Sequence, residues 1–500
     1  MAEKTKKAQI FKRDNTWWSK NWFYTILIAV AVTGGVCAFW VVPFVVPQPF
    51  SKDDSISTLR QAVLVATGGF LAILTLWENR RKNDQEHTRQ IHAERRSLYT
   101  TAIEQLADEK APIRLGGVYT LVKLVDEWLA DEKTLPSKEE RRQEGQIIVN
   151  SLCAYIRSSF PLAERHDELT LSYEEYQQKY QDKNQVTQSV ENSADNSTPK
   201  AKHQDNKQSS QSREEFVRDK SLFREEQEVR QTILSEIEKR LNGGEVKRED
   251  GKHEIKPGTW SYFEYDLLNT VFFYRVGFSN SYFGASSNFS GAKFTDFANF
   301  SEAKFTDFAD VWSADFSGAE FTEFVDFSGA EFTGLVNFSR AKFIKGTDFY
   351  WSADFSRAKL VEADFSGAEF TGLVNFSGAI FTWSADFSRA IFTWSADFSR
   401  AIFTQDAGFY GAAFIKSVIF SKATFQTDPI FVNIRRGKTY KARFSCKADP
   451  EDYNFEASND SPCIIETEEQ EYNGVKFMIP KGAELFDPDE PSEQNSDNSS

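Results

Sequence analysis

The stretch Ala363-Asp364-Phe365-Ser366-Gly367-Ala368-Glu369-Phe370 decides the fold of this chain, because variants of it recur from about residue 278 to residue 431. An aromatic residue returns after alternating steps of five and six, and a small residue stands two positions before it. A large and a small side chain therefore enter the same interior at every step. This period fits neither an amphipathic helix nor an ordinary strand, and it predicts a solenoid of short strands and corners.

The period also predicts how each coil closes. If each unit is a short strand plus a corner, four units close one square turn of about 21 to 23 residues, and turns stack at roughly 4.8 Å with the phenylalanines inside. The Asp or Asn before many phenylalanines is expected to point to a corner or to water. Recurring glycines are expected at corners that need unusual dihedral angles. Slips in the period, at 311–321 and 343–370, predict irregular or rotated coils there.

The quoted stretch resembles the pentapeptide-repeat proteins, whose unit reads A-(D/N)-(L/F)-x-x. The resemblance covers about a third of the chain and implies a mainly β solenoid, a right-handed quadrilateral β-helix, which we assign to residues 260–431. A second resemblance rests on residues 99–106 and 114–119, which look like the juxtamembrane segment of actinobacterial membrane-anchored pentapeptide-repeat proteins. It implies the order membrane hairpin, α-helical module, solenoid.

Two apolar runs near the N-terminus predict a transmembrane helical hairpin. Residues 22–46 carry no charge and exceed the roughly 20 residues that a helix needs to cross a bilayer. Residues 59–77 are charge-free after Arg60 and predict a return span, with a buried core helix as the alternative. Basic residues crowd residues 1–21 and the stretch after the second span, which predicts a multi-pass protein of the cell membrane with both termini cytoplasmic. Gly34-Gly35 and Gly68-Gly69 are expected to let the spans pack closely.

The remaining segments differ in composition. Apolar stripes at helical spacing predict a juxtamembrane helical module over 78–165, in which Gly116-Gly117 allows close helix packing. Residues 166–212 are polar and predict a disordered linker that acts as a flexible tether. A helix is predicted over 213–244, stopped by Gly243-Gly244, that caps or leads into the first coil. A C-terminal cap is predicted over 432–483, with a hairpin around Gly437, and a disordered acidic tail over 484–500.

Residues that typically carry chemistry are scattered. The five histidines lie outside the clear repeats, and no metal-ligand spacing, catalytic triad or phosphate-binding glycine loop is found in the sequence. We therefore predict no enzyme, no cofactor and no catalytic or metal-binding residue, and the binding residues stay unknown. The four cysteines are interpreted as thiols, although Cys446 and Cys463 are near enough in sequence to suggest pairing. The candidates for a contact surface are Trp312, Trp351, Trp383 and Trp394, with coverage of corners as the alternative.

Several functions fit these features. The first is a membrane-tethered, non-enzymatic interaction scaffold for a protein partner of unknown identity. The second is an acidic DNA mimic that binds a gyrase-like topoisomerase, because quinolone-resistance pentapeptide-repeat proteins resemble this solenoid and the chain has a formal charge of -15. The third is a channel or transporter component, which requires a homo-oligomer because neither span has an internal charge.

Two kinds of anionic partner are weighed differently. Direct nucleic-acid binding is disfavoured, because an acidic chain repels phosphate and the basic cluster at 435–447 is short. The basic stretch at 80–96 is instead expected to touch the anionic headgroups of the lipid bilayer.

Overall fold

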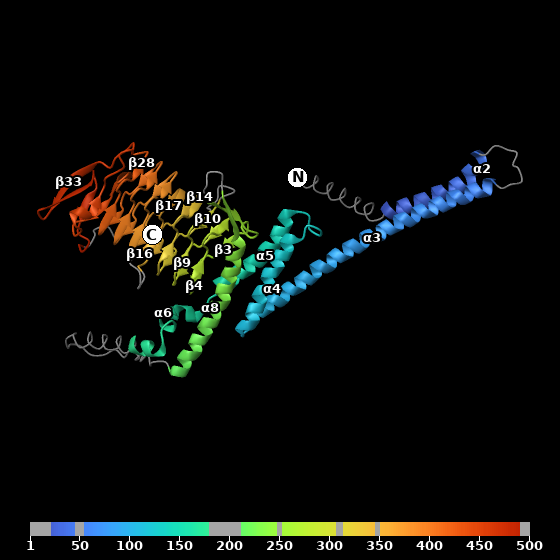
Figure 1. Cartoon of the computed structure of the whole chain (residues 1–500), viewed down its shortest axis with the longest axis horizontal. Coiled ribbons are helices and arrows are strands. Elements are labelled where there is room, and N and C mark those ends of the chain that lie inside the picture. The colour runs from blue at the N-terminus through green and yellow to red at the C-terminus, as the bar shows by residue number, and fades with distance from the viewer. Residues whose placement is uncertain are drawn as a thin grey trace. The chain divides into compact units, whose positions relative to one another are not determined.

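The computed structural model of the protein describes residues 22–45, 55–179, 212–247, 253–306, 314–345 and 351–490 (Figure 1). The chain divides into two compact units, one ending at Ser97 and the other beginning at Leu98. The predicted N-terminal segment 1–21, most of the predicted linker and the last ten residues of the predicted tail lie outside the described residues.

The first unit contains two apolar helices. The first runs over Trp22–Val41 and ends in the π-helical turn η1 (Cys37–Val41), which is followed by α2 (Val42–Val45). The second is α3 (Ser55–Leu106), which continues beyond this unit. Both helices are long and apolar enough to cross a membrane. None of the most apolar window of α3 is buried, which argues against the alternative of a buried core helix.

One of the four span glycines lies at a close contact between the helices. A Cβ at Gly34 would collide with the side chain of Thr67 on α3, so the two helices approach each other there. A Cβ at Gly35, Gly68 or Gly69 would meet nothing within 4 Å among the described residues. The prediction of close packing is therefore right for Gly34 and wrong, within this unit, for the other three.

The second unit begins with a helical module. It contains the end of α3 together with α4 (Ala111–Ala130), α5 (Lys138–Arg157), the 3₁₀ turn η2 (Pro161–Arg165), α6 (His166–Leu169) and a short helix at 173–179. Pro112 lies in the first turn of α4, where its missing N–H costs no helical hydrogen bond. A Cβ at Gly117 would lie 2.7 Å from the carbonyl oxygen of Ala102, which confirms close packing at Gly117, whereas Gly116 faces open space.

The predicted disordered linker is wrong at both of its ends. Residues 166–179 form helical turns, and α8 (Arg213–Leu241) begins with a capping box between Ser212 and Glu215. The rings of Tyr176 and Phe216 stack with centroids 4.8 Å apart. Segment 180–211 therefore leaves and rejoins the second unit at the same place, so its length does not set the reach of the solenoid.

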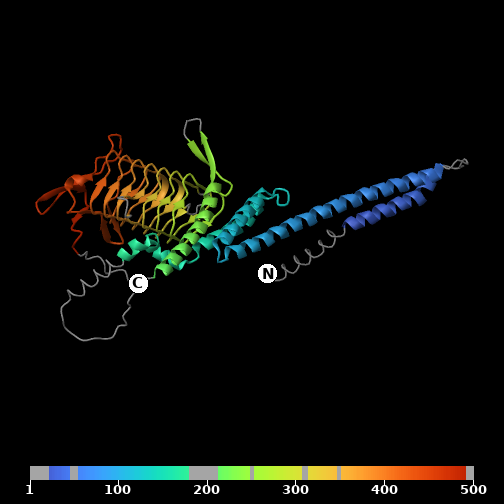
Figure 2. The same ribbon diagram turned by 60° about the horizontal axis from the view of Figure 1, so that its bottom comes forward.

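Residues from Tyr265 onward wind into coils, and the coils contribute short strands to four parallel ladders (Figures 1 and 2). We name each ladder after its first strand. The β4 ladder contains β4 (Val271–Phe272), β8 (Lys293–Phe294), β12 (Glu320–Phe321), β15 (Lys342–Phe343), β18 (Glu369–Phe370), β22 (Ile391–Phe392), β26 (Ala413–Phe414), β31 (Arg443–Ser445) and β35 (Glu484–Phe486). The β5 ladder contains β5 (Val276–Gly277), β9 (Ala298–Asn299), β13 (Val325–Asp326), β16 (Trp351–Asp354), β19 (Leu373–Asn375), β23 (Ser395–Asp397), β27 (Ser417–Ile419) and β32 (Tyr453–Asn454).

The other two ladders merge into one sheet, because β14 and β17 each turn a corner and belong to both. The β6 ladder contains β6 (Tyr282–Phe283), β10 (Lys304–Phe305), β14 (Glu331–Asn337), β17 (Lys359–Asp364), β20 (Ile380–Phe381), β24 (Ile402–Phe403) and β28 (Thr424–Phe425). The β3 ladder contains β3 (Tyr265–Asp266), β7 (Ser287–Asn288), β11 (Ala314–Asp315), β14, β17, β21 (Ala385–Asp386) and β25 (Ala407–Gly408).

The phenylalanines fill the interior, as predicted. Stacked rings from successive coils form columns. The ring centroid of Phe365 lies 4.9 Å from that of Phe338 in the preceding coil and 5.0 Å from that of Phe387 in the next coil. The small residues are buried beside the rings, including Ala319, Val325 and Ala330. Each buried Phe side chain contributes about 2 to 3 kcal/mol of hydrophobic free energy. The continuous columns therefore stabilise the stack without cross-links.

The prediction of irregular or rotated coils at 343–370 is confirmed in its first form, because two corners are irregular while the coils stay aligned. The coil from Phe343 to Phe370 is five residues longer than the coil from Phe370 to Phe392. The rings of Phe343 and Phe370 nevertheless stack at 4.7 Å with an interplanar angle of 2°. Register shifts of one residue occur in the β14–β17 and β16–β19 pairings. Most of the extra length lies between β15 and β16, where Phe355 follows Phe343 after twelve residues, whereas Phe376 follows Phe370 after six. Ring stacking and backbone pairing hold the columns in line, so extra residues are displaced at corners.

Both ends of the stack are covered (Figure 2). At the N-terminal end α8 stops at Leu241, and Gly243-Gly244 belong to β1 (Asn242–Lys247), which pairs with β2 (His253–Pro257). The predicted glycine stop is thus two residues too late. At the C-terminal end the ladders continue through β31, β32 and β35, so the boundary predicted at 431 and the disordered tail predicted from 484 are wrong.

The C-terminal coils are interrupted by inserted hairpins, which is why the repeat pattern fades there. One hairpin is β29 (Val432–Arg435) with β30 (Lys438–Lys441), as predicted around Gly437, and the other is β33 (Thr467–Tyr472) with β34 (Val475–Pro480). A 3₁₀ turn, η3 (Pro450–Asp452), precedes β32.

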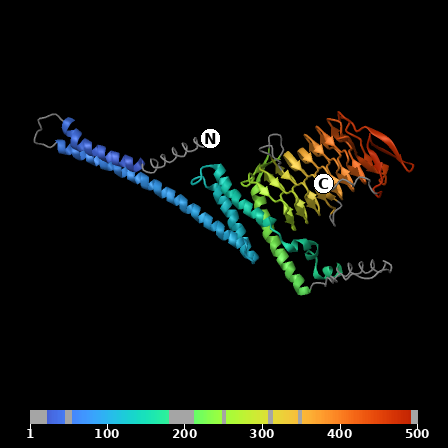
Figure 3. The same cartoon turned by 180° about the vertical axis from the view of Figure 1, so that it is seen from behind.

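A cluster of buried charged side chains connects α8, the green helix of Figure 3, to its neighbours. The Arg230 side chain, in a residue that is 2% exposed, donates to Glu226 at 2.7 Å and to the carbonyl oxygens of Ile156 and Ser158. Glu226 also accepts a hydrogen bond from the Tyr155 hydroxyl at 3.0 Å. These contacts join α8 to α5 directly, so the helical module and the solenoid are parts of one folded unit.

Candidate interaction surface

The repeated carboxylates and amides lie at corners, where they organise the turn. Asp364 Oδ1 accepts a hydrogen bond from the backbone N–H of Ser366 at 2.8 Å. The same bond recurs at other corners with Asp315, Asp326, Asn337, Asp354, Asn375, Asp386 and Asp397. A side-chain acceptor two residues before a backbone donor stabilises this kind of turn. The recurrence therefore confirms the predicted corner role.

The residue three positions after this corner position has a positive φ. In the first coils it includes Asn269, Asn280 and Glu302, and from Gly318 and Gly329 onward it is Gly or a basic residue. One column reads Gly318, Arg340, Gly367, Arg389, Gly411, and another reads Gly329, Arg357, Gly378, Arg400, Lys422. The φ of these arginines is 57° or 58°, a conformation that costs a non-glycine residue roughly 1–2 kcal/mol. Arg340 Cγ lies 3.7 Å from where a Cβ at Gly367 would stand, so the arginine stem covers the glycine of the next coil.

The aspartates form columns along the β3 and β5 ladders, in which Asn often separates two Asp residues. Asp326 and Asp354 are an exception, because they are direct register partners on β13 and β16. Burial raises the pKa of Asp354, the hydrogen bonds from Ser356 lower it, and the charge of Asp326 raises it further. A pKa raised by folding means that the deprotonated form destabilises the native state above that pKa.

Asp354→Asn is therefore expected to raise the free energy of unfolding at neutral pH by about 0.2–1 kcal/mol, the usual size of a cross-strand like-charge effect. The asparagine preserves the turn, as Asn375 does in the next coil with a 2.9 Å bond to Ser377. The gain is measured by thermal unfolding and should shrink as the pH falls toward 3, where Asp354 is protonated. Asp397→Asn is the control, since its register partners are Asn375 and Ile419, and an equal gain there would contradict the explanation.

The predicted tryptophan candidates do not form one surface. Trp312 lies outside the described residues. Trp351 and Trp394 lie on the corner between the β4 and β5 ladders, whereas Trp383 lies on the corner between the β6 and β3 ladders. The Trp394 ring is covered by Lys416, whose Nζ lies 3.4 Å from the ring centroid, and by Lys345 at 5.4 Å. Trp394 therefore fits the predicted alternative of corner coverage.

The other two tryptophans are open to solvent. Trp383 is 57% exposed and Trp351 is 40% exposed. On the same corner as Trp351 lie two half-buried aromatic rings, Phe297 and Phe324, whose centroids are 5.8 Å apart. The repeat period does not reveal these two rings, because each stands one residue before a small core residue, where the period of five and six places no aromatic residue. Exposed aromatic side chains are typical anchors of protein interfaces.

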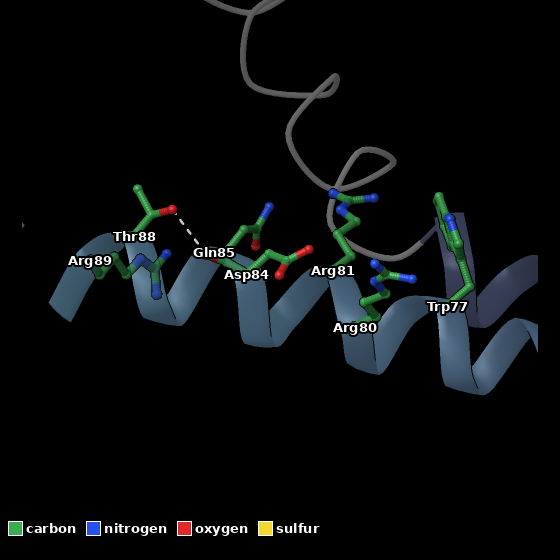
Figure 4. Close-up of a pocket in the computed structure, with 7 residues that line it drawn as sticks. All are labelled: Trp77, Arg80, Arg81, Asp84, Gln85, Thr88 and Arg89. Carbon is green, nitrogen blue, oxygen red and sulfur yellow. Dashed lines mark hydrogen bonds between the residues drawn. The ribbon is translucent and has the colours of Figure 1, made fainter. Parts of the chain in front are cut away.

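The basic face of α3 lies in the first unit (Figure 4). Trp77, Arg80, Arg81, Asp84, Gln85, Thr88 and Arg89 line a shallow pocket beside the helix. Trp77 ends the apolar stretch, and Arg80 and Arg81 follow after Glu78 and Asn79. A tryptophan next to arginines at the end of an apolar helix is typical of a cytoplasmic membrane interface.

The next question is whether the described residues could bind a metal ion or provide a reactive thiol. Within it, no group of three His, Cys, Asp or Glu side chains is placed to hold a metal ion. Cys37, Cys153, Cys446 and Cys463 are all free, which confirms their interpretation as thiols. Burial raises the pKa of the Cys153 thiol to about 12, so it is unreactive at neutral pH.

Four parallel ladders around stacked aromatic columns define a β-helical solenoid protein, and its corners repeat one turn with few residue types. Residues 344–391 and 387–434 match the family described as "Pentapeptide repeats (9 copies)". The repeat region of this chain is therefore a pentapeptide-repeat β-helix, preceded by helices. A search of curated proteins finds no match, and a search of solved structures finds none either.

Proposed function

We propose that this protein is a membrane-anchored, non-enzymatic scaffold that presents its solenoid to a protein partner in the cytoplasm. The observation that carries the proposal is α3, which continues without a break from an apolar, unburied stretch to the helical module that packs on the solenoid. A continuous helix with Trp77, Arg80 and Arg81 at its apolar end supports a cytoplasmic module behind a membrane span. Repetition of near-identical coils favours an extended binding surface over a unique catalytic pocket.

The anchor is tested by membrane fractionation of cells that express the full chain. We expect the protein to stay with the membrane at high salt and at alkaline pH and to be released by detergent. Residues of the solenoid should be labelled by a membrane-impermeant reagent only after the cell is opened. Release by salt alone, or labelling of intact cells, would contradict the anchor or the orientation.

The scaffold role is tested at the exposed aromatic residues. A photo-crosslinking amino acid at position 383 of the full chain, in its native membrane, is expected to trap a defined protein partner. The same label at position 394 is the matched control, because Trp394 lies on a different corner under two lysines. Equal trapping at both positions, or trapping at neither, would contradict a partner site at Trp383.

A second candidate is the acidic DNA mimic, and the carboxylate columns are the observation that favours it. Asp364 and Asp386 are direct neighbours on the β3 ladder, as Asp326 and Asp354 are on the β5 ladder. The exposed arginines and Lys422 at neighbouring corners interrupt such a surface, so we rank this candidate below the scaffold. Inhibition of gyrase supercoiling by the purified protein would reverse that order.

A further inference from the structure

The tip of the β29–β30 hairpin carries exposed cations and an exposed apolar side chain. Arg435, Arg436 and Lys438 surround the turn, and Ile434 is 68% exposed. Among the described residues none of these three cations has a carboxylate within 4.0 Å. The protein has a formal charge of -15, so this concentration of positive charge is local. We call these four residues the basic tip.

The basic tip joins a solenoid corner through cation–aromatic contacts. The Arg389 guanidinium lies over the Tyr440 ring at 4.7 Å, and the Arg435 guanidinium lies over the Tyr410 ring at 4.8 Å. Arg389 belongs to the corner column with positive φ, and glycine occupies this position in the next coil, at Gly411. The contacts extend the positive surface from the hairpin onto the corner, and they cover the faces of both tyrosine rings.

The conformation of the hairpin turn indicates that the arginine at its tip has a role in binding. Arg436 and Gly437 have φ values of 52° and 76°, the pattern of a type I′ turn, for which Asn-Gly is favoured. The second inserted hairpin has that preferred pair, Asn473 and Gly474, at φ values of 50° and 81°. The same kind of turn is therefore built with the favoured residue in one hairpin and with an arginine in the other. Arginine at a conformation that disfavours it suggests a role in binding rather than in folding.

We propose that the basic tip binds the anionic headgroups of the membrane, so that the far end of the solenoid is held at the lipid surface. The inference rests on the proposed anchor, which ties the chain that carries the hairpin to the membrane. Cations around an isolated apolar side chain suit an anionic lipid interface, in which Ile434 enters the acyl boundary and the arginines meet phosphates. An acidic protein is the less suitable partner, because the aromatic faces that anchor protein interfaces are here covered by guanidinium groups.

The test uses the full chain reconstituted in nanodiscs of phosphatidylcholine, with and without phosphatidylserine. Hydrogen exchange of the backbone amides at 433–441 is expected to slow in the anionic discs and to recover at high salt. Exchange at 468–478, the hairpin with the Asn473–Gly474 turn, is the internal control and should not change. Arg436→Asn should reduce the slowing about fivefold, the effect of one basic residue near an anionic surface.

Arg436→Asn also separates binding from folding. Asparagine is favoured at this turn position, so the variant hairpin should exchange no faster than the parent in neutral discs. Ile434→Ser should weaken the slowing without removing its dependence on salt.

Three outcomes would overturn the inference. The first is equal exchange in the two kinds of disc. The second is slowing by soluble polyglutamate but not by phosphatidylserine, which would assign the basic tip to an acidic protein. A chain that does not stay in the discs would overturn the anchor together with this inference, whereas a retained chain with a lipid-insensitive hairpin would overturn only the inference.

Discussion

Phe365→Ala is expected to lower the free energy of unfolding by about 3–5 kcal/mol, the cost of truncating a fully buried phenylalanine. Phe365 stacks on Phe338 and Phe387 and meets Phe355 and Phe376 edge to face at 5.3 and 5.4 Å. The cavity cannot collapse easily, because backbone pairing between coils holds all four neighbours in place. The measurement is chemical denaturation of the detergent-solubilised full chain, followed by circular dichroism.

Phe365→Leu is the matched control for that prediction. The chain itself tolerates leucine in a ring column, since Leu360 is buried between its register partners Phe332 and Phe381. Phe365→Leu should therefore cost less than half as much as the alanine change, because most of the volume is kept. Equal losses for the two variants would show that edge-to-face and stacked geometry, rather than filled volume, stabilises the column.

Glu226→Leu is expected to lower the free energy of unfolding by about 3–5 kcal/mol, the usual cost of leaving a buried charge without its partner. The change removes the carboxylate that accepts from Arg230 and from the Tyr155 hydroxyl. Burial, and then the charge of Glu226, raises the pKa of Tyr155, so this hydroxyl stays protonated and loses its acceptor in the variant. Thermal unfolding measures the loss, and hydrogen exchange at 265–278 should show that the first coil is exposed most.

Glu228→Leu, an exposed change on the same helix, is the control for helix propensity and hydrophobicity. Its side chain lies at the surface, so the expected change is within about 0.5 kcal/mol. If the two variants lost equal stability, the hydrogen bonds of Arg230 and Glu226 would not hold α8 on its neighbours. Apolar contacts of buried residues such as Val229 and Ile233 would then hold the helix over the end of the solenoid.

The two apolar helices and the solenoid could be predicted from the sequence because both are encoded by local patterns. The length of the charge-free run at 22–46 matches the thickness of a bilayer, so it predicts a membrane-spanning helix directly. The regular spacing of the phenylalanines matches the geometry of short strands, so it predicts which side chains face the interior. The turn at Asp364 and Gly367 is local for the same reason, as every bond in it spans only a few residues.

The errors have a different origin. The slip in spacing predicts irregular or rotated coils, and only irregular corners are found, because ring stacking between Phe343 and Phe370 is a contact between coils that keeps them aligned. The repeat pattern ends near 431 and therefore predicts the end of the solenoid there. The solenoid continues, because β31 pairs with β26 across an inserted hairpin. The sequence shows the basic tip only as part of a short basic cluster at 435–447, because the contacts of this hairpin with Arg389 and Tyr410 join residues far apart in the sequence.

Periodicity in this chain thus determines by itself that a β-helix forms and which side chains lie inside, since the same local choice is repeated in coil after coil. Only the tertiary structure decides that the helical module and the solenoid are one body. Arg230 contacts Ile156, and Tyr176 contacts Phe216, although the partners are far apart in the sequence. Such long-range contacts produce no periodic pattern in the sequence. For the same reason the polar composition of 166–212 does not reveal that residues near its two ends pack together.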